Sequence, residues 1–419
     1  MKKRILDGAI ILGISIAGLV LLEAGLRIVF PEKLVGSRFQ FYRTPLQYHP
    51  EYIYSLRPNL EWRYERDEIN GGDIIPLQTN SRSLRGDELR PDSDVRILVF
   101  GDSNIEGRFS RLKDTFTSKL ESYLNHKKDR DIEVVNAGTR GFGPDQNLIR
   151  LSLEVDSLDA DMVVFHIFAD NDFGDLIRNG LFDVEEGRLT RRYLPQRSNS
   201  LQRNISEFTS SLLITHAMKK FLKALSQLNA PTTDQTAESY VAELIALTEA
   251  EYAAFKNDGD SPLNRGSLST DHYDIDIAIH PASESSEKKI EIMEKIILEV
   301  RNLLRLKEID LLVLIQPSVV DLTNNYEVGH QYLERYSSYS RERLTSIVAD
   351  ICARLGIAHL NLFPVFLENE PETLFFQAVD DHWNESGQDL AAATAAELIH
   401  RSFLHAAPRV SGDGEPVAQ

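Results

Sequence analysis

The chain has 419 residues, enough for one large domain or two ordinary ones, and 42% of them are hydrophobic, as in a globular protein with a substantial core. Its 64 acidic and 46 basic residues give a formal net charge of −18, which argues against nucleic-acid binding. The single cysteine, Cys352, excludes an intramolecular disulfide and fits a small buried hydrophobic residue. No C-x-x-C or H-E-x-x-H motif is present, so no zinc site and no other cofactor is expected.

The amino terminus carries an apolar run from Ile5 to Leu22, preceded by three basic residues and interrupted only by Asp7. About 18 residues of helix reach about 27 Å, close to the hydrocarbon thickness of a bilayer. A cleaved signal peptide is the alternative, but Leu22-Glu23-Ala24 has a large residue where a cleavage site needs a small one. We therefore predict an uncleaved membrane anchor over residues 1–30 and an extracytoplasmic body, periplasmic or at the cell surface.

Residues 31–94 interleave six prolines with tyrosines and a tryptophan. This pattern predicts an irregular tether that packs on the body, with a short hairpin around Asn70-Gly71-Gly72. The aromatic side chains could stack on a sugar, or they could simply pack against the domain.

From Val95 onward, apolar runs alternate with helical patterns. The predicted strands cover 97–100, 132–136, 162–168, 311–315 and 359–362, and further helices are predicted over 287–306 and 341–355. Such alternation indicates an α/β fold with a doubly wound, mostly parallel, five-stranded sheet. We expect this domain to span residues 95–405 and to be followed by a disordered polar tail over 406–419.

The interval between the third and fourth strands is too long for a simple crossover. Helical patterns over 206–225 and 237–254 indicate that the excess carries structure of its own. We predict a helical insertion at about 180–285 that forms a wall or lid over one rim of the sheet.

Four loops carry polar residues at positions where strands end: Ser103, Gly141, Asn171 and the run Asp380-Asp381-His382-Trp383. In a doubly wound sheet such loops converge on one edge, where open α/β sheets place their chemistry. His166 and His359 lie within apolar strands and are expected to be core histidines.

These loops resemble, block by block and in order, the SGNH or GDSL-like hydrolase family. The matching blocks are Gly101-Asp102-Ser103, Asn136-Ala137-Gly138-Thr139-Arg140-Gly141, Asp170-Asn171-Asp172 and Asp380-Asp381-His382. The sequence departs from the family pattern at Asn104, where leucine is usual, and at Ala169, which replaces a glycine. The D-x-H-W spacing is similar to the membrane-tethered bacterial branch that includes alginate O-acetylation proteins. The resemblance covers about 95–180 and 310–400 and implies the flavodoxin-like SGNH fold.

The resemblance implies a catalytic triad of Ser103, His382 and Asp380, with Asp381 as the competing acid. It also implies an oxyanion hole formed by the backbone N–H groups of Ser103 and Gly141 and the side-chain amide of Asn171. The chemistry needs these groups independently, because a serine hydroxyl requires a base, the base an orienting carboxylate, and the oxyanion ready donors. Activity is expected to rise with pH as His382 loses its proton.

Other residues near the site have open roles. Arg140 and Trp383 could bind substrate, or they could serve packing or surface charge. Asp102 is expected to fix its loop as a hydrogen-bond acceptor, and Asp172 to brace its own loop. Asp380, Asp381 and His382 could ligate a metal, although no other ligand cluster in the sequence supports this.

Three functions fit these observations. The first is a serine esterase acting on O-acyl esters, with acetyl on a surface polysaccharide as the expected substrate. The second is an O-acetyltransferase with the same triad, and the third is a non-catalytic carbohydrate-binding or assembly protein. Exopolysaccharide-assembly proteins are the partners that this setting suggests.

Overall fold

We describe the protein from a computed structural model. The residues described are 15, 17–25, 45–127, 130–192, 233–257, 271–324, 326, 328–377 and 380–404.

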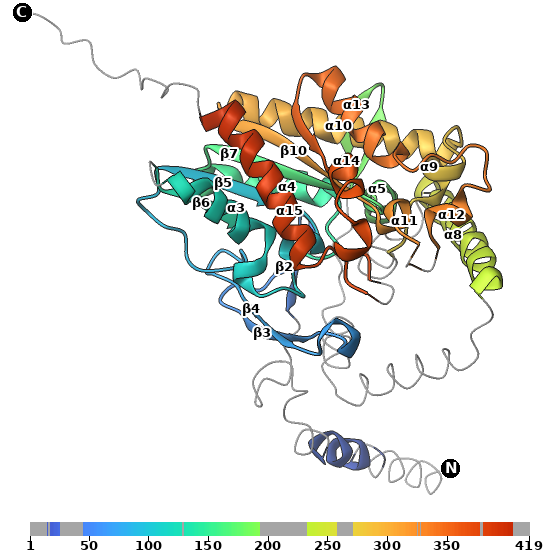
Figure 1. Ribbon diagram of the computed structural model, residues 1–419, viewed down its shortest axis with the longest axis horizontal. Helices are drawn as coiled ribbons and strands as arrows, with labels where there is room; N and C mark the ends of the chain where they lie inside the picture. Colours follow the sequence, from blue (N-terminus) through green and yellow to red (C-terminus); the bar gives the residue numbers. More distant parts are fainter. Residues whose placement is uncertain are drawn as a thin grey trace, which may run out of the picture.

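Among the described residues, five strands form one central parallel sheet (Figure 1). They are β5 (Val95–Phe100), β6 (Ile132–Asn136), β7 (Met162–Ala169), β10 (Asp310–Pro317) and β11 (Ala358–Asn361). Their order across the sheet is β11-β10-β7-β5-β6, and every neighbouring pair is parallel. This is the flavodoxin-like order, in which the chain starts in the interior and reverses its direction of travel beside the first strand.

The strands form where the sequence is continuously apolar. All eight residues of β7 are buried, as is typical of a parallel strand covered on both faces. The predictions for all five strands are confirmed, with β10 extending beyond 311–315 at both ends and β11 beginning and ending one residue before 359–362.

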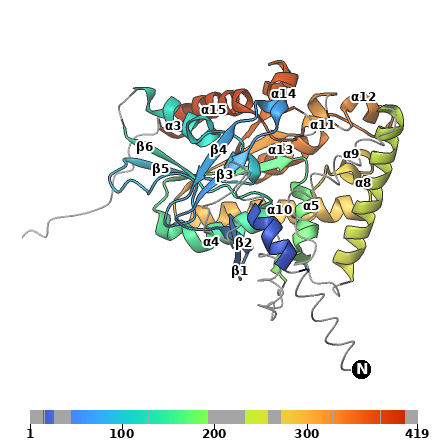
Figure 2. The same ribbon diagram turned by 90° about the horizontal axis from the view of Figure 1, so that it is seen from below.

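Helices cover both faces of the sheet. The longer ones are α3 (Phe116–Leu124), α4 (Pro144–Leu158), α10 (Glu284–Leu306), α13 (Arg343–Leu355) and α15 (Glu385–Ile399). On one face α3 packs against α15, while α10 packs between α4 and α13 on the other (Figures 1 and 2). The helices predicted over 287–306 and 341–355 are therefore confirmed, and Gly356 ends the second one in the left-handed conformation.

Short helical segments occupy the connections. They are α2 (Ser103–Glu106), α5 (Asp172–Asn179), α11 (Val319–Leu322), α12 (His330–Leu333), α14 (Leu362–Leu367), the 3-10 turns η2 (Glu68–Asn70), η3 (Leu112–Asp114), η4 (Asn125–Lys127) and η6 (Pro371–Thr373), and the π-turn η7 (His400–Leu404).

The segment before the sheet is more ordered than an irregular tether. It forms two antiparallel hairpins, β1 (Leu46–His49) with β2 (Ile53–Leu56), and β3 (Glu61–Glu65) with β4 (Ile74–Gln78). The second confirms the hairpin predicted around Asn70-Gly71-Gly72, and the first was not predicted. Both views place these hairpins against the body of the protein (Figures 1 and 2).

The predicted insertion at about 180–285 contributes a hairpin, β8 (Phe182–Glu185) with β9 (Arg188–Arg191), and the helices α8 (Thr233–Lys256) and α9 (Ile275–Ile279). The helix predicted over 237–254 is confirmed within α8. The helix predicted over 206–225 lies outside the described residues.

The predicted anchor over 1–30 lies largely outside the described residues. Within it the structure describes residues 15 and 17–25, which are helical. Within the described part of the chain, no helix combines the length and the apolarity needed to cross a bilayer. The tail predicted over 406–419 also lies outside the description.

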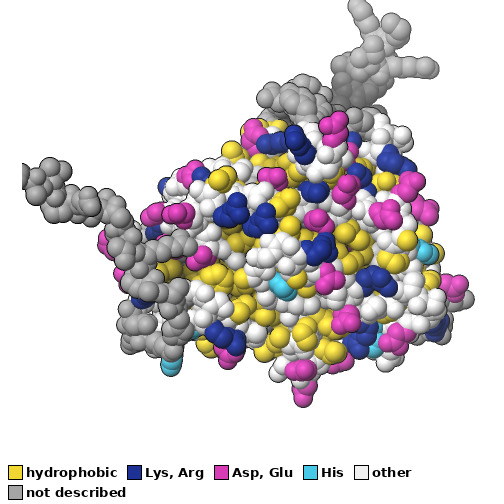
Figure 3. Space-filling view, turned by 90° about the horizontal axis from the view of Figure 1, so that it is seen from above, with side chains coloured by type: hydrophobic (Ala, Val, Ile, Leu, Met, Phe, Trp, Pro, Cys, Tyr) yellow, Lys and Arg dark blue, Asp and Glu magenta, His cyan; other side chains and the backbone are white. Residues whose placement is uncertain are grey.

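On the face shown in Figure 3, acidic and basic side chains are interspersed with apolar ones.

Candidate active site

The first and third site loops leave neighbouring strands. Ser103 follows β5 and Asn171 follows β7, and these strands are paired in parallel, so both residues lie at the carboxyl edge of the sheet. Because β6 lies on the other side of β5, this edge contains the topological switch point where doubly wound folds place ligands.

Ser103 opens the short helix α2 and is half-buried. The carboxylate of Asp102 accepts a hydrogen bond of 2.9 Å from the backbone N–H of Asn104, which confirms the loop-fixing role predicted for Asp102. Among the described residues, none forms a hydrogen bond with the Ser103 hydroxyl.

His382 is held by two carboxylates. Its Nδ1 lies 2.7 Å from Asp380 Oδ1 and 3.0 Å from Asp381 Oδ1, and the same Asp380 oxygen also accepts the His382 backbone N–H at 3.0 Å. The other ring nitrogen, Nε2, is buried and has no hydrogen-bond partner in the described part of the chain. The carboxylates thus fix the ring through Nδ1, and no described residue occupies the hydrogen-bonding position of Nε2.

The two carboxylates set the charge of this histidine. Burial by itself would lower the pKa of His382, but Asp380 and Asp381 outweigh it and raise the pKa to about 10. In turn, burial would raise the pKa of Asp380, and the neighbouring imidazolium lowers it below its usual value. The two carboxylates therefore favour the protonated form of the His382 ring.

The nucleophile loop and the acid–histidine loop are joined directly. Trp383 donates its indole N–H to the backbone carbonyl of Asn104 at 3.1 Å, and its backbone N–H to the Asn104 side chain at 3.3 Å. The residues next to Ser103 and His382 are therefore in contact although about 280 positions separate them in sequence. The asparagine at 104, unusual for the family, has a structural use here.

Trp383 is expected to stabilise this junction rather than to touch substrate, because it is 1% exposed and stacks on Phe116 at a centroid distance of 5.8 Å. The change Trp383→Phe leaves the buried carbonyl of Asn104 without its donor. We expect it to lower the free energy of unfolding by about 1–3 kcal/mol in urea titrations followed by circular dichroism. The other tryptophan provides the control: Trp62 Nε1 has no partner among the described residues, so Trp62→Phe should cost less, and equal losses would contradict the interpretation.

Gly141 lies in a tight turn beside the nucleophile loop. Its φ is +65°, a conformation that favours glycine, and its carbonyl accepts a hydrogen bond from the hydroxyl of Tyr54 in β2. The turn is thus fixed by the hairpin β1–β2, which belongs to the N-terminal segment before the sheet (residues 45–94). The sequence alone did not indicate this contact.

Asn171, the third predicted oxyanion donor, is buried, with 5% of its surface exposed. Its side-chain amide donates to the carboxylate of Asp271, while its Oδ1 is buried without a partner in the described residues. Asp271, which belongs to the predicted insertion, is a site residue that sequence analysis missed, because no periodicity or motif marks it.

Arg140 is buried and forms an ion pair with Glu106, with 2.6 Å between Nη2 and Oε1. The sequence left open whether Arg140 and Trp383 bind substrate or serve packing or surface charge. In the structure the contacts of both residues are packing contacts within the protein. Asp172 accepts the backbone N–H of Phe168 at 2.6 Å, which confirms its bracing role.

The two histidines predicted to lie in the core differ in their surroundings. His166 is buried, with its Nε2 2.9 Å from Gln316 Oε1, and burial lowers its pKa. His359 is only half-buried, and its Nδ1 lies 3.2 Å from the carbonyl of Ile357.

The N-terminal segment also holds the acid–histidine loop. Asn70 exchanges two hydrogen bonds with the backbone of Gln377, of 3.0 and 2.8 Å. Arg66 donates from Nε to the carbonyl of Phe109 at 3.0 Å and pairs with Glu385. To predict the contacts with Gln377 and Glu385, one would have to know which residues meet across more than 300 positions of the sequence.

Asp380, Asp381 and His382 offer ligand atoms that lie within 4.8 Å of one another. This trio is the group that the sequence had identified as a metal-binding alternative. A metal would have to use the same His382 ring that the triad uses, so the two roles exclude each other.

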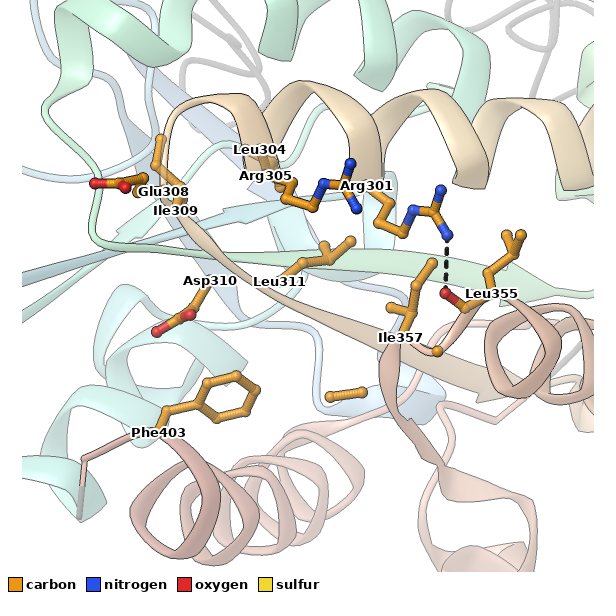
Figure 4. A pocket seen from close by; sticks show the side chains of 12 residues that line it. Arg301, Leu304, Arg305, Glu308, Ile309, Asp310, Leu311, Leu355, Ile357 and Phe403 are labelled. Atoms are coloured by element: carbon orange, nitrogen blue, oxygen red, sulfur yellow. Dashed lines mark hydrogen bonds between the residues drawn. The ribbon is translucent and has the colours of Figure 1, made fainter. Parts of the chain in front are cut away.

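A hollow of about 700 Å³ lies elsewhere, at the opposite edge of the sheet. Asp310 and Ala358, the first residues of β10 and β11, line it, with Arg301 and Arg305 of α10 on one side and Phe403 on the other (Figure 4). Because it adjoins the amino ends of the strands, this hollow is separate from the candidate catalytic residues.

The structure thus combines a flavodoxin-like sheet with a serine at the carboxyl end of β5 and an acid–histidine loop in contact with the serine's loop. Residues 278–417 match the family model described as SGNH hydrolase-like domain, acetyltransferase AlgX. This match includes the acid–histidine block but not the Ser103 block, and over these residues it supports the family resemblance seen in the sequence.

Similar solved structures include the acetyl xylan esterase AlAXEase, at 13% identity over 73% of this chain and 100% of that one, with a TM-score of 0.37. A variant of the acetyl-xylooligosaccharide esterase Axe2 from Geobacillus matches at 13% identity over 75% of this chain and 97% of its own, with a TM-score of 0.35. A lipase/acylhydrolase from Enterococcus faecalis matches at 13% identity over 73% of this chain and 95% of its own, with a TM-score of 0.32. No curated protein matches the chain in sequence.

Proposed function

We propose that the protein is a serine-dependent ester hydrolase that acts on O-acetyl esters of cell-surface or extracellular polysaccharide. The observation that carries this proposal is the His382 imidazole, which Asp380 orients through Nδ1 and whose buried Nε2 has no hydrogen-bond partner among the described residues. In this role Nε2 takes the proton of the Ser103 hydroxyl as its oxygen attacks the ester carbonyl. The alcohol leaves with that proton, and water then releases the acyl group from Ser103 as the free acid.

The developing oxyanion needs donors that are already in position. The backbone N–H groups of Ser103 and Gly141 and the amide of Asn171 have this role in the proposal. The Asn171 amide carries two hydrogens, so one can bond to Asp271 while the other is directed at the oxyanion.

The decisive test is time-dependent labelling of Ser103 by a fluorophosphonate, located by mass spectrometry, together with acetate release from acetylated oligosaccharides. Labelling at Ser103 with loss of acetate release supports the proposal. Absence of labelling with acetate release intact would reject a serine mechanism, and absence of both would favour the non-catalytic carbohydrate-binding or assembly protein. Release that is abolished by a chelator and restored by added metal would instead favour the metal alternative.

An O-acetyltransferase with the same triad is the second candidate. It is favoured by the family description, which names an acetyltransferase, for residues 278–417. The first half of the reaction is unchanged, and in the second half a sugar hydroxyl attacks the acyl-enzyme in place of water. Comparison of acetate release with acetyl transfer to added glycan, at equal donor turnover, separates the two activities.

We further propose that residues 1–30 anchor the protein in a membrane and that its body is extracytoplasmic, near exopolysaccharide-assembly proteins. The apolar run from Ile5 to Leu22 supports this proposal. Recovery of the full chain from the membrane fraction after alkaline carbonate washing would agree with an anchor, and recovery from the supernatant would refute it.

Removal of the Asn171 amide tests the oxyanion hole. We expect Asn171→Ala to lower kcat by about 10²–10³ with little change in KM, since the donor acts on charge that develops in the transition state. The exposed Asn369 provides an asparagine outside the proposed oxyanion hole, and Asn369→Ala should leave kcat unchanged. A normal kcat in a folded Asn171→Ala protein would remove Asn171 from the mechanism.

A further inference from the structure

A buried ion pair connects the loop of the nucleophile to the loop of the oxyanion glycine. Glu106 is 0% exposed and lies three residues after Ser103 on α2. Arg140, directly before Gly141, donates to this carboxylate from Nη2 at 2.6 Å, from Nε at 3.2 Å and from its backbone N–H at 2.7 Å. Three donors from one residue leave the carboxylate little freedom to shift relative to the turn.

The backbones on either side of this pair are in direct contact. A Cβ atom at Gly138 would lie 2.3 Å from the backbone nitrogen of Glu106, so only glycine fits between the two loops. The side chain of Asn136 donates to the carbonyl of Ile105 at 2.7 Å. The Glu106–Arg140 pair therefore completes a close-packed junction between α2 and the loop that ends at Gly141.

The N-terminal segment encloses the same junction. The Arg140 guanidinium lies over the ring of Tyr64, with 4.7 Å between its central carbon and the ring centroid. The hydroxyl of Tyr54 reaches the carbonyl of Arg140 at 3.2 Å, and Arg85 donates to the carbonyls of Glu106 and Ser110. These groups shield the pair from water. Away from water the attraction between the two charges is stronger, and it holds the geometry of the pair more firmly.

We propose that Glu106 and Arg140 are positioning residues, which fix the place of the Ser103 hydroxyl relative to the Gly141 turn, and that the segment 54–85 completes this part of the active site. The inference rests on the proposed function, because it assigns the pair a role in the reaction at Ser103. Neither residue touches the substrate in this role.

If the Glu106–Arg140 pair only stabilised the fold, a replacement that leaves the protein folded would leave kcat unchanged. Buried ion pairs can often be replaced by apolar residues of similar volume without loss of stability, since the desolvation of both charges offsets their attraction. Such a replacement keeps the packing but loses the forked geometry of the guanidinium and carboxylate. Stability and catalysis therefore separate in the doubly apolar variant, and that separation distinguishes positioning from simple support of the fold.

The experiment compares Glu106→Leu/Arg140→Met with the wild-type full-length protein. The matched control is Arg96→Met/Glu133→Leu, which replaces another buried Arg–Glu pair, 2.7 Å apart with both side chains 9% exposed. That control pair joins the amino ends of β5 and β6, at the opposite edge of the sheet. Thermal unfolding, kcat and KM on acetylated substrate, and the rate of fluorophosphonate labelling are measured for each protein.

We expect the Glu106/Arg140 double variant to remain folded, with an unfolding temperature lowered by the loss of the acceptor for the Arg140 backbone N–H, and to lose about 10²-fold in kcat and in labelling rate, with KM unchanged. The control double variant should keep its kcat whatever its unfolding temperature. Arg140→Lys, which retains the charge but not the fork, should give an intermediate kcat and is the deciding variant if the double variant does not fold.

A folded Glu106/Arg140 double variant with wild-type kcat and labelling rate would overturn the inference, as would a wild-type kcat in Arg140→Lys. Failure of the proposed function gives a different result, namely turnover that persists in Ser103→Ala. Loss of turnover in Ser103→Ala together with an unaffected double variant would reject the positioning role alone.

Discussion

The change Ser103→Ala is expected to lower the rate of acetyl-ester turnover by about 10⁴-fold or more, because no other group can form the acyl-enzyme at this position. The substitution removes one oxygen from a half-buried side chain that makes no hydrogen bond to the described residues, so the fold should be retained. Steady-state hydrolysis of p-nitrophenyl acetate, with circular dichroism to verify folding, measures the effect.

The exposed hydroxyl of Ser157 provides the control for this experiment, since Ser157→Ala removes the same atom far from the site. Its turnover should equal that of the wild type. If Ser103→Ala retains wild-type turnover, both the esterase and the transferase proposals fail together, because they share the acyl-enzyme.

The sheet and the site loops could be predicted because local sequence specifies them. Five apolar runs bounded by turn residues became the five parallel strands, and the order of the four polar blocks placed Ser103 and Asn171 at one edge. A parallel strand buried on both faces needs a continuous apolar run, and this signal survives in a single sequence.

The supporting contacts could not be predicted, because they join segments that are distant in sequence. The polar residues Tyr54, Asn70 and Asp271 occur in stretches that contain many similar residues, and only the folded chain shows which of them reach the site. Glu106 alone carried a local signal, since it follows Ser103 by one helical turn. For the same reason the segment 31–94 was expected to be a tether, whereas its hairpins contact three of the four site loops.

The charge of the site is also a product of tertiary structure. The sequence places two aspartates before His382 and leaves open which of them orients the ring. The structure places both carboxylates within 3.0 Å of Nδ1 and so favours the imidazolium form. The activating base must then be generated from a protonated histidine, and the rising part of the pH–rate profile moves to alkaline pH.

The two aspartates can be separated by their opposite effects. We expect Asp380→Asn to lower kcat by about 10⁴-fold, because the amide no longer fixes the tautomer that leaves Nε2 free to accept a proton. We expect Asp381→Asn to retain the mechanism and to lower the pKa of His382, since one of the two carboxylates that raise it toward about 10 is lost. The base form of the ring then appears at lower pH.

The sign follows from the fraction of neutral imidazole. Below the pKa of His382 the rate rises about tenfold for each pH unit, so a lowered pKa shifts the rising limb of the profile to lower pH by the same amount and raises the activity at pH 7. Profiles of kcat/KM from pH 6 to 10.5 for the wild type and both variants measure this. The reverse pattern, with Asp381→Asn inactive and Asp380→Asn active at lower pH, would assign Asp381 as the triad acid. A wild-type profile that is flat over this range would show that His382 is not the base.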